Sequence, residues 1–512
     1  MFESLDKDIV ESSNSANLKD YSFLYGLNLD QDVVNRLSTH LKSIYSGNSD
    51  VYLSPMAKDN NPETILAMWD KIFKANKSKM NDVLLNLEET NRSKFGPRSI
   101  ALPWKDRLDG VLDYFKDQEP GRFGLKLNPI NVKRSPALRP ISMESALNLL
   151  KNNTNSGLPY YTRKSRIKGR ILSNLDKLKY RDDPCILFTR TQESLKTRTV
   201  WGFPIYDTLM EMVYYKPLLD YQKRMSYRSA LLGPEMVDKA ITSLILTSVR
   251  SGLILISVDF SAFDASVGFE LQDASFHYIK SLFQPNYLGG LDERFRRFNT
   301  IGLVTPDGVM SGHHGVPSGS TFTNEVDSIA QYLVAINSNC VNPDNIQIQG
   351  DDGVYAIAEN EIGNLFDNFR SGGLKLNESK SYRANNYVIY LQKLFHLDYY
   401  KDGLIGGIYP VYRALERILF QERWSEFEDY GLTGIDYYSI RAITILENCK
   451  YHPLFKELVE FVYRLDKYHL GYTKKGVGKY KDLVSQGPGQ GGVLINQYGD
   501  DLSGIDNFET VK

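Results

Sequence analysis

The stretch NIQIQGDDGVYAIAE, residues 345–359, sets a Gly-Asp-Asp tripeptide between two short runs of alternating apolar residues. Alternation with a period of two predicts strands. Two strands with residues 350–353 at their tip form a hairpin that holds Asp351 and Asp352 on a tight turn, where glycines allow unusual backbone angles. The same tripeptide recurs at residues 499–501 with no strand after it, which favours two solvated acids there.

A second group of carboxylates lies in LILISVDFSAFDAS, residues 253–266. The apolar run predicts a buried strand that ends at Asp259, with Asp264 shortly after it. A buried acid is costly unless it is paired or bound to a metal. Magnesium takes one or two carboxylates together with substrate phosphates, and two such ions can hold both oxygens of a phosphoryl transfer. Asp259 and Asp351 on neighbouring strands are therefore predicted to bind Mg²⁺, with Mn²⁺ as the alternative ion.

Composition limits the class of protein. The chain has 512 residues, 42% of them hydrophobic and 24% charged, as in a folded protein of several domains or one multi-lobed enzyme. Three widely spaced cysteines have no zinc spacing and indicate a reducing compartment. The adjacent His313 and His314 point to opposite faces of an extended segment, so no shared metal ion is expected. With no leader-like N-terminus and no membrane-length apolar run, a soluble intracellular protein is expected.

Charge is concentrated in two segments, although the net charge is only −1. Residues 160–199 carry eleven lysines and arginines and four acids, which predicts either a nucleic-acid contact or a solvated basic face. Residues 484–512 are rich in Gly, Gln and Asn and carry four acids and one lysine. This composition predicts a flexible acidic tail, which we expect could fold back into a basic product path before initiation.

Seven segments together resemble the motifs of viral RNA-dependent RNA polymerases, in the order in which that family carries them. DFSAFD (259–264), GVPSGSTFTNEVDS (315–328) and QGDDG (349–353) resemble motifs A, B and C. The other four are TNSGLPYYTRK (154–164, motif G), LKTRTVWGFP (195–204, motif F), GLKLNESKS (373–381, motif D) and YLQKLFH (390–396, motif E). The motif B variant and the chain length are most similar to polymerases of small double-stranded RNA viruses, picobirnaviruses first and partitiviruses second.

The resemblance implies an α+β fold of the right-hand polymerase type, in which a palm with an antiparallel sheet lies between fingers and a helical thumb. The implied domains are an N-terminal extension (1–90), fingers (91–205), palm with motif A (206–282), a fingers insertion (283–314), palm with motifs B to E (315–400), thumb (401–483) and the flexible C-terminal tail (484–512).

The resemblance also assigns roles at the reaction centre. Asp259 and Asp351 match the family's metal ligands, and Asp352 matches an outer or occasional ligand beside them. Lys380 matches the motif D lysine, a proposed general acid for the pyrophosphate leaving group, with Lys375 as its competitor.

Nucleotide contacts are implied by motifs F, A and B. Lys196 and Arg198 fall where the family contacts the incoming triphosphate and its base, and fixed cations opposite the metals stabilise such a polyanion. Recognition of the ribose 2′-OH suits acidic and hydroxyl side chains. The matching positions are Asp264, Ser318, Thr323 and Asp327, and Gly319 suits a mobile loop near the template.

Asp327 departs from the commoner family pattern, because many positive-strand relatives carry Asn at this position. An ionised Asp can only accept hydrogen bonds, whereas Asn can also donate them. Either the hydrogen-bond direction changes here, or Asp327 is protonated.

RNA contacts are implied at two further motifs. Ser156, Gly157, Arg163 and Lys164 of motif G would line the path of the template, although a simple turn explains the segment nearly as well. Lys393 of motif E would contact a primer phosphate.

The implied activity is RNA-directed RNA synthesis by two-metal nucleotidyl transfer, which replicates and transcribes a viral double-stranded RNA genome and starts without a primer. The implied partners are template RNA, NTPs, the double-stranded genome and, as a further candidate, the capsid protein. The expected form is a monomer without membrane contact, inside the virion in the host cytoplasm.

Three other classes stay open on the sequence alone. A reverse transcriptase usually carries a bulky residue where this chain has Asp264. A non-enzymatic RNA-binding virion protein would explain the basic segment but not Asp259 and Asp351. A two-metal nuclease or phosphatase would explain the acids but not the ordered segments of motifs B and F.

Overall fold

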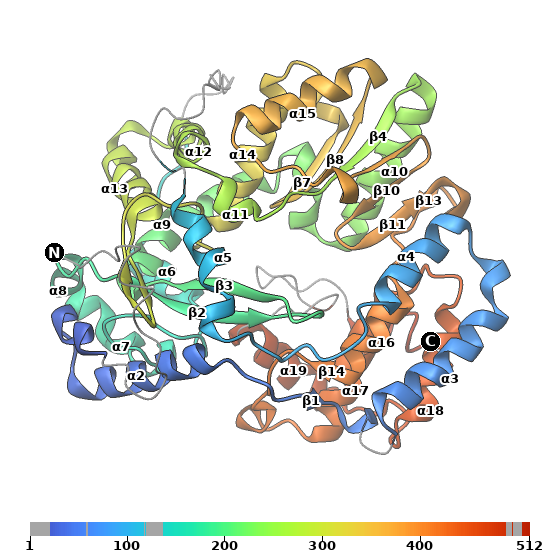
Figure 1. The fold of residues 1–512 in the computed structure, drawn as a ribbon, viewed down its shortest axis with the longest axis horizontal. Helices are drawn as coiled ribbons and strands as arrows, with labels where there is room; N and C mark the ends of the chain where they lie inside the picture. The colour runs from blue at the N-terminus through green and yellow to red at the C-terminus, as the bar shows by residue number, and fades with distance from the viewer. Residues whose placement is uncertain (1–20, 58–59, 117, 119–136, 488–493, 495–503) are drawn as a thin grey trace.

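The computed structural model describes residues 21–57, 60–116, 118, 137–487, 494 and 504–512. Two four-stranded sheets and a group of C-terminal helices form three bodies in the expected right-hand arrangement (Figure 1). One sheet belongs to the palm and the other to the fingers, and the helices form the thumb. None of the helices in the described part of the chain is long and apolar enough to span a membrane.

The palm sheet has the strand order β7-β8-β4-β9, and every neighbouring pair is antiparallel. Its side chains alternate between two buried faces, as a pleated sheet requires. Ile256 packs in a core that includes helix α14, whereas Leu255 packs with residues of helix α10. Because both faces are covered, the sheet is a rigid base for the loops at its end. The elements are β4 (Ile254–Val258), β7 (Ile346–Gln349), β8 (Asp352–Ile357), β9 (Tyr382–Ala384), α10 (Pro234–Ser251) and α14 (Thr323–Asn337).

The predicted hairpin is confirmed, with one correction at its tip. Gln349 lies opposite Asp352, so Gly350 and Asp351 alone form the turn. Asp352 is the first residue of β8 and not part of the tip. Gly350 has a φ of +63°, in the left-handed region that glycine adopts without steric cost.

The fingers sheet has the order β3-β2-β5-β6. Strands β2 and β3 form an antiparallel hairpin, and β5 runs parallel to β2. The chain therefore returns to the fingers after motif A, through helix α13, which contacts α9. The elements are β2 (Cys185–Thr191), β3 (Thr197–Gly202), β5 (Leu303–Thr305), β6 (Gly308–Met310), α9 (Ile205–Gln222) and α13 (Leu288–Thr300).

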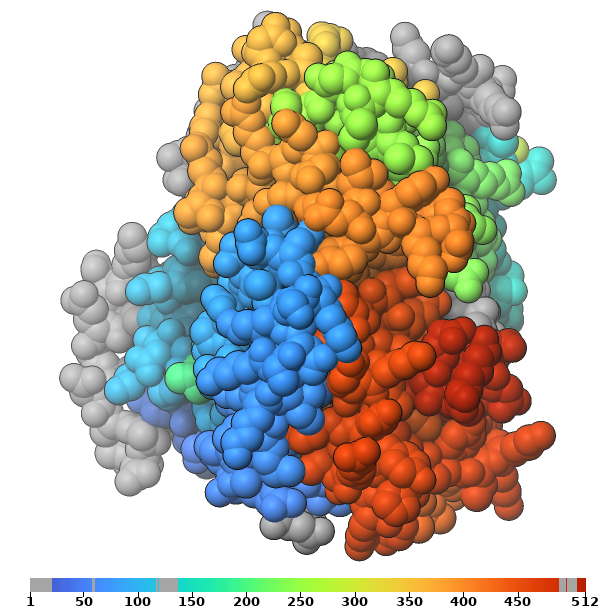
Figure 2. Space-filling view, turned by 90° about the vertical axis from the view of Figure 1, so that its right-hand side faces the viewer, coloured from blue at the N-terminus to red at the C-terminus, as the bar shows by residue number. Residues whose placement is uncertain are grey.

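The N-terminal segment connects the fingers to the thumb. Helix α2 packs in the fingers, whereas α3 and α4 pack in the thumb, where Trp69 and Phe73 are buried. Figure 2 shows this blue part of the chain lying alongside the orange and red thumb. The helices are α2 (Gln31–Ser46), α3 (Pro62–Ala75), α4 (Asp82–Arg92), α16 (Val411–Leu419), α17 (Gly434–Glu447), α18 (Phe455–Leu465) and α19 (Lys474–Gln486).

The other regular elements are mostly short and join these bodies. Strand β1 pairs with β14, which ties the N-terminal segment to the thumb, and β10 pairs with β11 in the motif E hairpin. They are α5 (Leu108–Leu112), α6 (Met143–Leu149), α7 (Lys168–Ile171), α8 (Leu175–Lys179), α11 (Phe263–Ser266), α12 (Phe269–Leu282), α15 (Ile362–Ser371), β1 (Tyr52–Leu53), β10 (Tyr387–Tyr390), β11 (Lys393–His396), β12 (Tyr400–Lys401), β13 (Leu404–Ile405) and β14 (Phe420–Gln421).

The prediction of a flexible tail from residue 484 is wrong for part of that segment. Helix α19 continues to Gln486, and residues 504–512 dock on the thumb. Ile505 and Phe508 are buried, and the backbone N–H and the hydroxyl of Thr510 donate to Glu447 at 3.0 and 2.9 Å. The two apolar side chains anchor a segment whose composition is otherwise polar. The second Gly-Asp-Asp, at 499–501, lies outside the described residues.

A buried group of charges joins the fingers to the thumb. Arg98 is 3% exposed and donates to Glu193, Glu416 and Glu422 at 2.6, 2.9 and 2.9 Å. Glu193 lies in the turn between β2 and β3, and it also accepts from Arg413 of α16 at 2.9 Å. Although burial alone would raise it, Arg413 and Arg98 lower the pKa of Glu193 to about 2. The hairpin that carries motif F is thereby held against the thumb.

We expect Arg98→Met to destabilise the protein, because three acids lose a shared buried partner. Breaking such a buried pair costs about 3–5 kcal/mol of the free energy of unfolding. The matched control is Arg464→Met, since Arg464 forms an exposed pair with Glu460 and exposed pairs contribute little. Thermal unfolding of both variants measures the difference. Equal shifts of the two midpoints would contradict a bridging role for Arg98.

Candidate active site

Three aspartates meet at one end of the palm sheet. Asp259 follows the last residue of β4, whose Val258 lies opposite Gly353 of β8. Burial raises the pKa of Asp259, and the charge of Asp351 raises it further. Burial and the charges of Asp351 and Asp259 raise the pKa of Asp352 to about 8. The structure therefore brings the three predicted metal-binding residues to one place.

These carboxylates fit hard divalent cations in an open site. Asp351 is exposed, whereas Asp259 and Asp352 are partly buried. Within the described residues, no group of three or more His, Cys, Asp or Glu side chains is placed so that it could hold a metal ion. The predicted set of three ligands is thus not a preformed cage. Magnesium at such sites takes one or two carboxylates and completes its shell with phosphate oxygens and water, and Asp259 and Asp351 fit that donor set.

Helix α14 holds the Gly350–Asp351 turn in place. The N–H of Gly350 donates to Ser328 Oγ at 2.8 Å, and Gln331 Nε2 donates to the carbonyls of Gly350 and Asp351 at 3.0 and 3.2 Å. The hydroxyl of Tyr355 donates to Gln331 Oε1 at 2.7 Å. Sequence reasoning missed both clamping residues. Ser328 ends the motif B segment and Gln331 follows three residues later on the same helix. This spacing places them on one face and is the only sequence signal that points to them.

Motif D is tied to the end of β4. The N–H of Asp259 donates to Ser381 Oγ at 3.1 Å, and its carbonyl accepts from the N–H of Asn377 at 2.9 Å. The charge of Lys380 lowers the pKa of Asp259 against the effect of burial. Its competitor Lys375 has an exposed side chain and contributes its carbonyl to the N–H of Ser261 at 2.8 Å. The structure thus favours Lys380 as the cation at the acids.

Two cations of the fingers act on the same acids. Lys196 precedes β3 and Arg198 lies on it. Partial burial and Arg198 lower the pKa of Lys196, while Asp351 raises it. The charge of Arg198 in turn lowers the pKa of Asp352. Fixed cations opposite a carboxylate-lined metal site are the arrangement that a bound triphosphate requires.

A chain of hydrogen-bonding groups lies beside the metal site. Ser318 Oγ donates to Asp264 in a short hydrogen bond, and Tyr114 Oη lies 3.2 Å from Ser318 Oγ. Tyr114 is buried and was missed by sequence reasoning, because it lies outside the seven motifs. Because the Ser318 hydroxyl donates its hydrogen to Asp264, the Ser318 oxygen accepts a hydrogen bond from the Tyr114 hydroxyl.

The carboxyl groups of Asp264 and Asp327 influence each other. Burial raises the pKa of Asp327 well above its ordinary value, and the charges of Asp264 and Asp351 raise it further. Burial also raises the pKa of Asp264. Of the two possibilities that the sequence left open for Asp327, the direction of this shift favours the protonated form.

Gly319 and Thr323 shape the turn that presents Ser318. The N–H of Trp201 in β3 donates to the Ser318 carbonyl at 3.0 Å, and a Cβ at Gly319 would lie 2.0 Å from the Trp201 carbonyl oxygen. The hydroxyl of Thr323 lies 2.9 Å from the carbonyl of Pro317 and 3.0 Å from that of Ser320. The hydroxyl proton predicted to serve the sugar is thus used inside the turn.

The motif G side chains mostly build their own loop. Ser156 is fully buried; its hydroxyl accepts from the N–H of Thr162 and donates to the Gly157 carbonyl, each at 3.2 Å. A Cβ at Gly157 would lie 2.1 Å from the Phe203 carbonyl oxygen. Lys164 donates within the loop at 2.8 Å, and burial lowers its pKa to about 8. The predicted RNA contacts of the Ser156 and Lys164 side chains are therefore corrected to loop-building contacts, and the turn interpretation holds.

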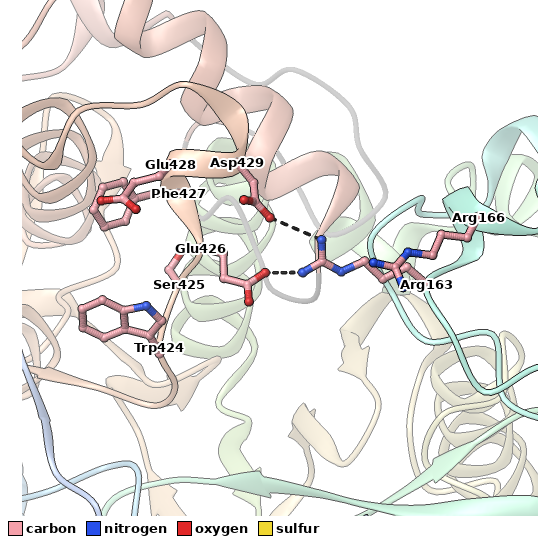
Figure 3. Close-up of a pocket in the computed structure, with 8 residues that line it drawn as sticks. All are labelled: Arg163, Arg166, Trp424, Ser425, Glu426, Phe427, Glu428 and Asp429. Carbon is pink, nitrogen blue, oxygen red and sulfur yellow. Dashed lines mark hydrogen bonds and ion pairs between the residues drawn. The ribbon is translucent and has the colours of Figure 1, made fainter. Parts of the chain in front are cut away.

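Arg163 also has a protein partner. It forms ion pairs with Glu426 and with Asp429, the second at 3.3 Å, across a pocket of about 440 Å³ that Trp424 also lines (Figure 3). These acids belong to the thumb, so Arg163 makes a second contact between fingers and thumb. The RNA contact of Arg163 stays a prediction.

Lys393 lies in a different place from the acids. It lines a pocket of about 120 Å³ with Asp238 of α10 and with Phe508. Burial lowers the pKa of Lys393, and Asp238 opposes this effect. Lys393 thus lies near Asp238 and the docked C-terminus, and its contact with a primer phosphate stays a prediction. The rings of His313 and His314 contact different neighbours, Phe269 and Trp201.

Comparison with known proteins agrees with this geometry. A family model described as viral RNA-dependent RNA polymerase matches residues 115–462. Because this is well over half of the chain, the chain belongs to the family of viral RNA-dependent RNA polymerases. It is an RNA-directed RNA polymerase, which excludes the three other classes that the sequence alone left open.

Individual relatives match most of the chain. The potential RNA-dependent RNA polymerase of Human picobirnavirus (strain Human/Thailand/Hy005102/-) is 28% identical over 517 residues, covering 93% of this chain and 96% of the relative. The RNA-directed RNA polymerase of Cryptosporidium parvum virus 1 (strain KSU-1) is 23% identical over 309 residues, covering 56% and 57%. The crystal structure of the RNA-dependent RNA polymerase of a human picobirnavirus superposes with a TM-score of 0.77 at 24% identity, covering 94% of this chain and 98% of that one. The right-hand polymerase fold is thereby confirmed.

We expect Gly319→Ala to lower RNA synthesis by about a hundredfold, because the new methyl group pushes the Ser318 turn off β3, and a displacement of about 1 Å at an active site has this effect. The control is Gly312→Ala, since Gly312 also has a positive φ, of +120°, but a Cβ added there would meet no atom of the described residues within 4 Å. Nucleotide incorporation on an RNA template compares the two. Equal losses would show that backbone strain, and not contact with Trp201, sets the requirement for glycine.

Proposed function

We propose that this polymerase replicates and transcribes a viral double-stranded RNA genome by two-metal nucleotidyl transfer. One observation carries the chemistry: Asp259 and Asp351 lie together at the end of two paired strands, opposite Lys196 and Arg198. The likeness to the picobirnavirus polymerase along most of the chain supports the kind of genome.

Divalent ions, Mg²⁺ or Mn²⁺, supply Lewis acidity to the attacking and the leaving oxygen when bound. Asp259 and Asp351 hold them, with Asp352 in an outer position. Lys196 and Arg198 bind the triphosphate by charge and orient it toward the acids. Lys380, beside Asp259, donates a proton to the pyrophosphate leaving group.

Selection of ribonucleotides belongs to Asp264, Ser318 and Asp327. A protonated Asp327 donates to Asp264, which leaves oxygen lone pairs of Asp264 to accept a hydrogen bond from the ribose 2′-OH. Tyr114 acts through Ser318 and orients its hydroxyl. The pKa of Asp327, which burial and the charge of Asp264 raise, supports this assignment.

The template is single-stranded RNA, and synthesis starts without a primer, inside the virion in the host cytoplasm. The double-stranded genome and the capsid protein are the other partners of this monomeric enzyme. The resemblance of the seven motifs to those of double-stranded RNA virus polymerases supports these proposals.

We expect Asp351→Asn to reduce RNA synthesis by at least about a hundredfold, because a carboxylate ligand becomes a neutral amide. The matched control is Asp500→Asn, the same change in the second Gly-Asp-Asp, which should retain activity. The assay contains purified protein, a single-stranded RNA template, four labelled NTPs and Mg²⁺ or Mn²⁺. EDTA should abolish the product, and comparable losses in both variants would contradict the assignment of the site.

We expect Asp327→Asn to keep the preference for NTPs over dNTPs, because the amide donates to Asp264 as the protonated acid does. Asp327→Leu should lower that preference about tenfold, since a hydrogen bond is lost. In the wild type the preference should fall as pH rises through the raised pKa of Asp327, where Asp264, Asp351, Arg198 and Tyr114 are its charged or titratable neighbours. The Asn variant should show no such fall. The ratio of kcat/KM for ATP and dATP measures this, and a lost preference in Asp327→Asn would show that the ionised form is the working one.

A further inference from the structure

A buried carboxylate lies beneath the motif B turn and belongs to none of the seven motifs. Glu211, on α9, is 2% exposed. Its Oε1 accepts from Ser320 Oγ at 2.8 Å, and its Oε2 accepts from the N–H of Thr321 at 2.7 Å. Both carboxylate oxygens are therefore used on the two residues that follow Ser318 and Gly319.

These two hydrogen bonds continue into the turn itself. Ser320 Oγ accepts from the N–H of Phe322 at 3.0 Å, and the Ser320 carbonyl lies 3.0 Å from Thr323 Oγ1. The N–H of Gly319 donates to the same Thr323 hydroxyl at 3.3 Å. One end of the turn is thus tied to Glu211, while the other is tied to Trp201 of β3 through the Ser318 carbonyl.

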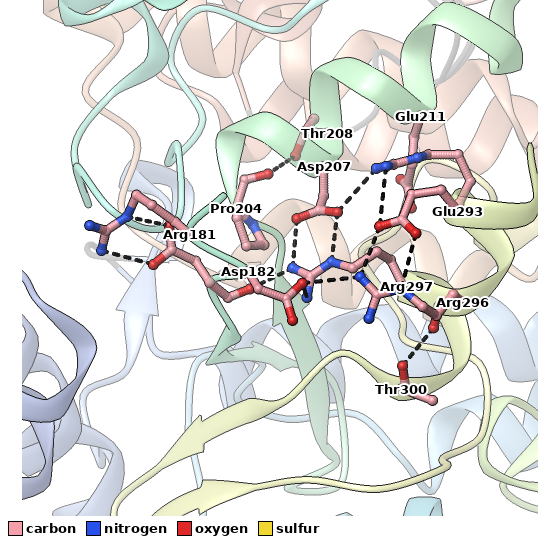
Figure 4. Close-up of polar contacts among 12 residues, drawn as sticks. Arg181, Asp182, Pro204, Asp207, Thr208, Glu211, Glu293, Arg296, Arg297 and Thr300 are labelled. Carbon is pink, nitrogen blue, oxygen red and sulfur yellow. Dashed lines mark hydrogen bonds and ion pairs between the residues drawn. The ribbon is translucent and has the colours of Figure 1, made fainter. Parts of the chain in front are cut away.

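Glu211 is itself held rigidly, because α9 is bound to α13 one helical turn earlier. Asp207 accepts from Arg297 at 2.9 and 2.7 Å and from Arg294 at 3.1 Å, and Arg297 donates to the Asp183 carbonyl at 2.6 Å (Figure 4). All four side chains are largely buried. A carboxylate on such a support can fix a neighbouring turn with little movement.

Glu211 carries a cost that packing alone does not explain. Burial raises its pKa to about 7, opposed by the donors Ser320 and Thr321 and by the charge of Arg294. A buried acid without a full ionic partner is destabilising unless hydrogen bonds compensate. Here the compensating donors come from the turn that presents Ser318.

We propose that Glu211 is a positioning residue for ribonucleotide selection, which fixes the motif B turn so that Ser318 meets Asp264. The proposal rests on the proposed role of Asp264 and Ser318 in sugar recognition. Glu211 touches neither substrate nor metal; it acts through Ser320 and Thr321. The residue therefore links α9 to the group that reads the sugar.

The test is Glu211→Leu, compared with Glu88→Leu. Glu88 is also fully buried. Its two carboxylate oxygens accept from the N–H groups of Val411 and Tyr412 at the start of α16, at 2.7 and 3.2 Å, and His452 Nε2 lies 2.9 Å from one of them. In both variants an apolar side chain leaves at least one buried backbone N–H without its acceptor. The two changes are therefore matched in burial and in the kind of bond lost, but only one lies under the motif B turn.

We expect both variants to unfold at lower temperature, and only Glu211→Leu to change selection. Its kcat/KM ratio for ATP over dATP should fall about tenfold, because the Ser318 turn loses its anchor. In Glu88→Leu the ratio should equal that of the wild type. An unchanged ratio in Glu211→Leu at a comparably lowered unfolding temperature would overturn the proposal.

A further variant separates this proposal from the one on which it rests. Ser318→Ala removes the sugar-facing hydroxyl directly and should lower the ATP over dATP ratio whether or not Glu211 acts on the turn. A lowered ratio in Ser318→Ala with an unchanged ratio in Glu211→Leu overturns only the role of Glu211. An unchanged ratio in Ser318→Ala overturns the assignment of the sugar site itself.

Discussion

Repulsion among the aspartates at the end of β4 and β8 is the constraint on which the rest of the site depends. The pairing of these two strands forces Asp259, Asp351 and Asp352 together. The negative charge of Asp351 raises the pKa of both Asp259 and Asp352, which is the effect of repulsion between like charges. Each surrounding element either reduces this repulsion or holds the aspartates in place against it. Motif D brings Lys380, the fingers hairpin brings Lys196 and Arg198, and α14 holds the turn from below. Divalent cations held by these acids would relieve the remaining repulsion.

The parts of this site that sequence could predict are those defined by local periodicity. Period-two alternation is a property of a strand alone, so β4 and the β7–β8 hairpin, with their acids, could be read directly. The clamping role of Gln331 could not, because it depends on where α14 lies relative to the turn. The same holds for Tyr114 and Glu211, whose partners lie far away along the chain.

Charged residues were harder to assign, because a charge in the sequence does not name its partner. Arg163 and Lys164 were expected to face RNA, yet the structure gives each a partner within the protein, and Lys393 lies near the charge of Asp238. The polar composition of the C-terminal segment likewise led to the wrong prediction that all of it is flexible. Ile505 and Phe508 are two apolar residues in a polar segment, and their burial outweighs the average character of the segment around them.

The contacts around Arg98 and Arg163 have a topological consequence. Fingers and thumb touch at both places, and the palm joins them on the other side, so the three bodies form a closed ring of contacts. The acids of the palm and the cations of the fingers face each other within this ring. A linear RNA can be threaded through a ring by its free end. A covalently closed circular RNA has no such end, and it would reach Asp351 only after the salt bridges on one side of the ring had separated.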